Sequence, residues 1–180
     1  MDKSIIVNQT RQWVEEVIVG FNFCPFAKPV VDVDGVAYEV ITEASLESCL
    51  EGLAEQLEKL QHQPEIETCL VIFPVGYDAF DQYLDLLEWS EALIKDMGYE
   101  GEFQLASFHP DYCFEGAELD DAANYTNRSP YPMLHLIREK SIEIALKTVK
   151  EPEKIPLRNI EFAREKGQVE MAKNLAKCLK

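Results

Sequence analysis

The sequence predicts a single α/β domain that spans residues 1–180. Three short apolar segments alternate with segments whose apolar residues recur at helical spacing, the order expected of strands joined by helices. With hydrophobic residues at 47%, the chain can bury a sizeable core. We therefore expect a mainly parallel sheet of three to four strands, flanked by helices and followed by C-terminal helices. A ferredoxin-like α+β fold is the alternative.

The first elements are predicted from spacing and turn residues. Residues 4–19 place apolar side chains, Trp13 among them, on one helical face, and Gly20 ends that helix. Residues 36–41 follow an Asp-Gly turn and form a strand, with which residues 30–33 are expected to pair.

A helix, a buried strand and a second helix follow. Ser45 caps a helix that ends near Pro64, and its leucines recur every three or four residues. Residues 68–73 are continuously apolar, which is typical of a strand buried on both faces. Asp78 is expected to cap the next helix, which ends at Gly98.

The second half contains one strand, a long loop and helices. Residues 103–108 form the third strand, and a segment without periodicity then extends over about residues 108–131. A helix is expected at 132–149, followed by a helical segment at 157–179 with a break near Gly167.

Charge and cysteine content limit the classes of function. The chain has 17 Lys+Arg against 33 Asp+Glu and a net charge of -16, which repels nucleic acid and anionic lipid surfaces. We expect no nucleic-acid partner and no membrane partner. The basic segment 147–180 either packs on the acidic remainder of the chain or forms a solvated face. Five cysteines without a CxxC pair suit free thiols in the cytoplasm.

The loop is the candidate site, because long ordered loops are often functional and because it follows a strand end. Arg128 is its one arginine, and Ser129 before a proline resembles the start of a helix, which favours an anion. The predicted substrate-binding residues are Asn127, Arg128, Ser129, Tyr131 and Arg138. In the alternative interpretation, Arg128 pairs with a loop carboxylate and holds the loop closed.

Two histidines are candidates for proton transfer. His109 directly follows the third strand, and His135 shares one face of the predicted 132–149 helix with Tyr131 and Arg138. Both are predicted as candidate catalytic residues, and each has a structural role as the alternative.

No metal site is predicted, although a weaker alternative combines histidine with carboxylates of the loop. The residues of that alternative are His109, Asp111, Asp120 and Asp121, with Glu115 and His135 as further candidates. Cys24 is interpreted as a buried thiol between Phe23 and Phe26, and the alternative is a nucleophile with His109 as its base.

Four segments together resemble a bacterial family of uncharacterised proteins of about this length. They are Gly20–Ala27, Ser107–Pro110, Asn124–Leu136 and Ile155–Asn159. The resemblance implies a bacterial, cytosolic, single-domain protein, and it implies no reaction, cofactor or catalytic residue. Glu115 is a departure, because an apolar residue is expected before Gly116 in this family.

The resulting functional hypothesis is an enzyme that binds a small anionic metabolite at the edge of the sheet. Its cofactor and oligomeric state are not indicated. The alternative is a non-catalytic binding or protein-interaction module that uses the 108–131 loop. An enzyme should place His109 and Arg128 in one concave pocket, whereas a docking module should expose the aromatic residues of the loop on a convex patch.

Overall fold

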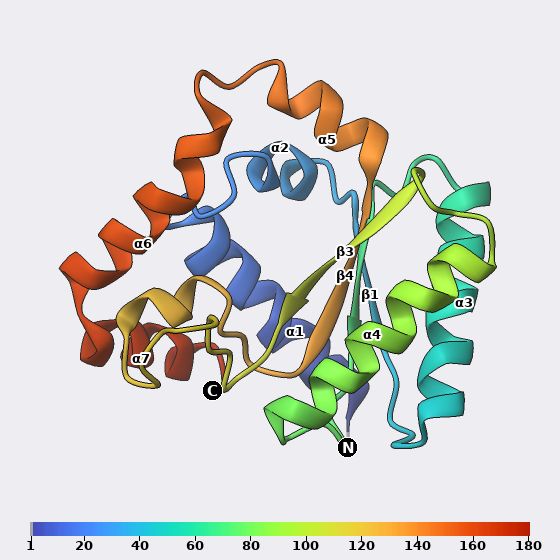
Figure 1. The fold of residues 1–180 in the computed structure, drawn as a ribbon, viewed down its shortest axis with the longest axis horizontal. Coiled ribbons are helices and arrows are strands. Elements are labelled where there is room, and N and C mark those ends of the chain that lie inside the picture. Colours follow the sequence, from blue (N-terminus) through green and yellow to red (C-terminus); the bar gives the residue numbers. More distant parts are fainter. Residues whose placement is uncertain (1) are drawn as a thin grey trace.

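A four-stranded sheet lies between two layers of helices in the computed structural model, which describes residues 2–180 (Figure 1). The strands lie in the order β1-β2-β4-β3. They are β1 (Val36–Val40), β2 (Thr68–Ile72), β3 (Phe103–Phe108) and β4 (Met133–Arg138).

Helices cover both faces of this sheet (Figure 1). On one face lie α3 (Leu46–His62) and α4 (Phe80–Asp96). On the other lie α1 (Lys3–Trp13) with its π-helical continuation η1 (Val14–Val19), α6 (Ile155–Lys166) and α7 (Gln168–Lys177). The shorter elements are α2 (Ala27–Asp32), the 3-10 turns η2 (Ala122–Thr126) and η3 (Pro152–Lys154), and α5 (Glu139–Leu146).

Alternation along the strands divides the core into two clusters. In β2, Cys69 and Val71 pack towards α3 and α4, whereas Leu70 and Ile72 pack towards α1. The central strand β4 alternates in the same way, with Leu134 facing α3 and α4. Because both faces of β2 and β4 are covered, their sequences are almost continuously apolar.

The sheet is mixed, and the mainly parallel arrangement expected from the sequence is not confirmed. β1 and β2 are parallel, but β4 is antiparallel to both β2 and β3. The ferredoxin-like alternative does not fit either, because helices cover both faces instead of one. Two reversals still leave β3 running in the same direction as β2, so the segments that follow these strands leave the sheet at the same end.

The expected helix at 132–149 is wrong. Residues 133–138 form β4, and only residues 139–146 of that segment are helical. Leu134 and Ile137 are three residues apart, which suggested a helix, but the segment is the strand that fills the space between β2 and β3. Tertiary pairing overrides the local pattern here. As a result, Tyr131, His135 and Arg138 do not share a helical face.

Two smaller expectations are also wrong, and three are confirmed. Residues 30–33 belong to the end of α2 and its cap instead of a strand, and α4 begins after Ala79 without a side-chain cap from Asp78. The Ser45 hydroxyl does cap α3 by accepting a hydrogen bond from Ser48 N at 3.2 Å. The three sequence-predicted strands are present, and the C-terminal helices break at Gly167.

Candidate functional site

His109 is fully buried, and both of its ring nitrogens are bonded to the backbone. Nε2 lies 2.8 Å from Tyr77 O, and Nδ1 accepts a hydrogen bond from Asp111 N at 2.9 Å. Since a carbonyl only accepts, the proton is on Nε2. Burial lowers the pKa of His109. This geometry joins the loop after β3 to the loop after β2 and leaves no ring nitrogen for a substrate.

The Arg128 side chain also donates hydrogen bonds to the backbone of the loop in which it lies. Its Nε donates to Tyr112 O at 3.1 Å and its Nη2 donates to Leu119 O at 2.9 Å. The guanidinium carbon lies 4.7 Å from the centre of the Tyr125 ring. The alternative interpretation, in which Arg128 holds the loop closed, fits this geometry, except that carbonyls replace the expected carboxylate.

The neighbouring predicted binding residues have similar internal partners. Asn127 Nδ2 donates to Ser107 O at 3.2 Å, and the buried Ser129 hydroxyl donates to Tyr131 O at 2.6 Å. No helix begins at Ser129, because β4 follows it, so there is no helix N-terminus to receive an anion. The Tyr131 hydroxyl donates to Gln9 Oε1 on α1.

Arg138 lies at the other end of β4 and on the opposite face from His135. Its Nη2 donates to Leu60 O at 2.5 Å and to Ile66 O at 3.0 Å, and its guanidinium lies over the Phe103 ring. These contacts fix the connection between α3 and β2. The structure therefore does not bring Arg138 together with Arg128.

The carboxylates of the alternative metal site are also separated. Asp121 forms a two-point ion pair with Arg164 on α6, in which Nη2 lies 2.6 Å from Oδ2, and Arg164 holds the pKa of Asp121 down to about 2. Asp111, Glu115 and Asp120 are exposed. Across residues 2–180, no three side chains among the His, Cys, Asp and Glu residues are grouped so that they could hold a metal ion.

His135 differs from His109 because one of its ring nitrogens has no hydrogen-bond partner. It lies in the middle of β4, opposite Leu70 of β2 and Ala106 of β3, and its side chain points to the α1 side of the sheet. Nε2 lies 2.6 Å from Thr68 Oγ1. Nδ1 has no hydrogen bond with any described residue, and it is not one of the fully buried unpaired atoms. Nδ1 is therefore unpaired without being completely enclosed.

Thr68 determines which nitrogen of His135 carries the proton. Its hydroxyl has one proton, and Oγ1 lies 2.5 Å from Leu136 O, which can only accept. Oγ1 must therefore accept from Nε2–H of His135, and the lone pair is on Nδ1. Burial lowers the pKa of His135 to about 4, so the ring is neutral at pH 7.

Two aromatic residues, Phe108 of β3 and Trp13 of α1, form the surroundings of His135. The Phe108 ring centre is 6.2 Å from the imidazole, and Trp13 of α1 meets Phe108 edge to face at 5.1 Å. Trp13 Nε1 donates to Arg128 O at 3.1 Å. The loop therefore contributes to this region through its backbone and through Phe108, while the Arg128 and Asp121 side chains are paired elsewhere.

Cys24 lies on the same side of the sheet as His135 and packs against the α1 cluster. Its thiol is partly buried, and burial raises its pKa, which fits the structural interpretation. The segment around it is held by α6, where Asn159 Nδ2 donates to Phe23 O at 2.7 Å and Arg158 donates to Asn22 O. Asn22 has a φ of 55°, which these contacts stabilise.

The short helices α2 and α5 cover their neighbours only in part, with Ala27 and Val31 of α2 packed against the α1 cluster. Neither α2 nor α5 has a fully buried residue, and Val33 and Ile144 are 76% and 56% exposed.

Sequence patterns did not indicate Thr68 or Arg158 as relevant to the site. The polar residue at the start of the apolar segment 68–73 was the available signal for Thr68.

Comparisons with known proteins identify a family but no function. No helix among residues 2–180 is long and apolar enough to cross a bilayer. No match was found among curated proteins or among solved structures. Residues 5–173 match a family described as protein of unknown function (DUF1415). The chain therefore belongs to the DUF1415 family.

Proposed function

We propose that the protein binds a small molecule on the α1 face of its sheet, and that His135 Nδ1 accepts a hydrogen bond from an N–H or O–H group of that ligand. In a reaction, the same atom acts as the general base. The observation that carries this proposal is the lone pair on Nδ1, because Thr68 fixes the tautomer and no described residue forms a hydrogen bond with Nδ1.

The pKa of His135 restricts the chemistry. A ring with a pKa of about 4 is neutral throughout the physiological range, so its lone pair is available to a donor at every such pH. A base this weak abstracts a proton efficiently only from an acidic donor. Binding through a hydrogen bond is accordingly the primary role, and proton transfer is restricted to acidic substrates.

The proposed ligand is defined by its donor group instead of by an anionic charge. The anion expected from the sequence relied on Arg128 and a helix N-terminus, but Arg128 donates its Nε–H and one N–H of Nη2 to Tyr112 O and Leu119 O. No helix begins at Ser129. The docking alternative has less support as well, because the aromatic side chains of the 108–131 loop are half-buried or buried. Leu119 is the exposed large apolar residue there, at 74%.

The test is a thermal-shift screen of small alcohols, amides, amines, carboxylic acids and phosphate esters. A ligand that stabilises the wild type should bind His135→Phe about 2- to 12-fold more weakly, the range expected for one lost hydrogen bond. His62→Phe is the matched control, because the His62 side chain is 72% exposed on α3 and should leave binding unchanged. If no compound stabilises the wild type, or if both variants respond equally, the proposal is wrong.

Thr68→Val tests the positioning of the ring separately from its presence. Valine removes the acceptor of Nε2–H and leaves the imidazole in place, so part of the population should carry its proton on Nδ1. Ligand binding should weaken, and ¹⁵N NMR of the ring should show a mixed tautomer. An unchanged single tautomer in Thr68→Val would show that Thr68 does not determine it.

A further inference from the structure

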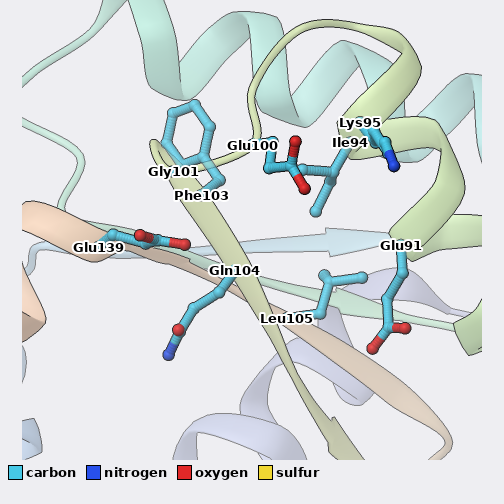
Figure 2. Close-up of a pocket in the computed structure, with 9 residues that line it drawn as sticks. All are labelled: Glu91, Ile94, Lys95, Glu100, Gly101, Phe103, Gln104, Leu105 and Glu139. Carbon is cyan, nitrogen blue, oxygen red and sulfur yellow. The ribbon is translucent and has the colours of Figure 1, made fainter.

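The outer edge of β3 is open and borders a hollow beside α4. β3 is the last strand in the sheet order, so only one of its edges is paired. A hollow of about 240 Å³ lies between this strand and α4. Its floor includes Ile94, Phe103 and Leu105 (Figure 2). The hollow therefore offers an apolar floor directly beside unpaired strand backbone.

The register of the sheet shows which backbone groups of β3 are free. Glu139 N donates to Glu102 O at 3.0 Å, just beyond the last pair of β3 and β4. Hydrogen-bonded pairs recur at every second residue in an antiparallel ladder. Gln104 and Ala106 therefore direct their N–H and C=O groups towards β4, and the residues between them direct theirs outward.

Among the outward-facing N–H and C=O groups of β3, only those at the two ends form hydrogen bonds within the protein. Phe103 N donates to Tyr99 O at 3.1 Å, and Ser107 O accepts from Asn127 Nδ2 at 3.2 Å. The outward N–H and C=O of Leu105 have no partner within residues 2–180, and neither do Phe103 C=O and Ser107 N–H. An extended chain could pair with both groups of Leu105.

The rim of the hollow is acidic. Figure 2 shows Glu91 and Glu100 on the α4 side of β3 and Glu139 on the other side, with Lys95 as the one basic lining residue. None of these three carboxylates forms an ion pair with any described residue. The rim is thus free to pair with positive charge, and the net charge of -16 attracts a basic partner.

We propose that β3 accepts an extended, lysine- or arginine-bearing segment of another protein, which adds a fifth strand opposite Leu105. Backbone bonds to Leu105 give the pairing, and an apolar side chain of the segment fills the hollow above Ile94 and Phe103. Basic side chains on either side of it meet Glu91, Glu100 and Glu139. A second copy of this chain fits less well, because it would bring carboxylates against carboxylates.

Amide hydrogen exchange tests the geometry of the edge. In the free protein, the amides of Leu105 and Ser107 should exchange quickly, while those of Gln104 and Ala106 should be protected by β4. The probe is a peptide with one lysine two residues before a valine and another two residues after it, so that all three side chains share the face of the hollow. Its addition should slow exchange at Leu105 and Ser107. Slow exchange at these two amides without peptide, or no added protection with it, would overturn the proposal.

Fluorescence anisotropy with the same labelled peptide tests the charge argument. Glu91→Gln/Glu100→Gln should weaken binding about 2- to 30-fold, the range for two exposed ion pairs, and added salt should reduce that difference. The matched control is Glu88→Gln/Glu143→Gln, two exposed carboxylates on α4 and α5 outside the hollow, which should bind as the wild type does.

Two outcomes would contradict the identity of the partner. Equal binding of a peptide with glutamate in place of lysine would exclude a basic segment. Concentration-dependent dimerisation in sedimentation, lost in Leu105→Pro but not in Glu88→Gln, would assign the edge to a second copy of the chain. Because the hollow lies on the α4 side of β3 and His135 faces α1, failure here leaves the proposal for His135 untouched.

Discussion

Replacement of His109 by alanine should destabilise the protein severely. The change removes the bonds to Tyr77 O and Asp111 N and leaves a carbonyl and an N–H without partners beside a fully buried position. Each orphaned group costs about 1 to 3 kcal/mol. The ring also packs against Phe80 and Tyr83, with centres 5.2 Å and 5.1 Å away. We expect a loss of about 3 to 6 kcal/mol in the free energy of unfolding.

Urea unfolding followed by tryptophan fluorescence measures this loss. The free energy of unfolding of a domain of this size is about 5 to 15 kcal/mol. His109→Ala should therefore lower the urea midpoint greatly or unfold the protein at 25 °C. His62→Ala is the matched control and should change stability by less than about 0.5 kcal/mol, because His62 is exposed. A loss below about 1 kcal/mol for His109→Ala, combined with loss of ligand binding, would refute the structural role and restore the catalytic one.

Three further predictions concern the loop and the titrating groups. Arg128→Ala should cost about 1 to 3 kcal/mol and make residues 108–131 more sensitive to limited proteolysis, since two carbonyls lose their donor; unchanged cleavage would contradict its role as a clamp. Because Arg164 holds the pKa of Asp121 down to about 2, their pairing stabilises the fold above pH 3.8 and is lost towards pH 2. Arg164→Ala should therefore show less acid-dependent loss in urea midpoint than the wild type. Burial lowers the pKa of His135, so on acidification the unfolded chain binds a proton before the folded protein does. The free energy of unfolding should therefore fall by up to about 3 kcal/mol between pH 6.5 and pH 4. This part of the pH dependence should be absent in His135→Gln.

Much of the fold could be predicted because its signals are local. The leucine spacing and Ser45 cap of α3, the apolar segment of β2 and the break at Gly167 each depend on neighbours in the sequence. β4 was missed because its apolar residues fit a helix locally, and only its pairing with β2 and β3 makes it a strand. The direction of a central strand depends on contacts that are distant in sequence, which is why the parallel sheet was not confirmed.

The candidate site was predicted less well, for a physical reason. A long loop without regular ladders must satisfy its own backbone groups, and its most versatile donors do this. Arg128 binds carbonyls of Tyr112 and Leu119, and His109 links two loops. His135 was a candidate residue, but its partner Thr68 is 67 residues away, and their pairing depends on the register of the sheet.

The most direct test of the role of His135 is a ¹⁵N NMR titration of the imidazole rings from pH 8 to pH 4. The protein has three histidines, and His62→Gln and His135→Gln assign the signals of His62 and His135. We predict that His135 remains neutral with its proton on Nε2 down to about pH 4, and that a bound ligand shifts the Nδ1 resonance. Titration of His135 near pH 6.5, or a proton on Nδ1 at neutral pH, would contradict the claim that His135 presents a free lone pair at the sheet face.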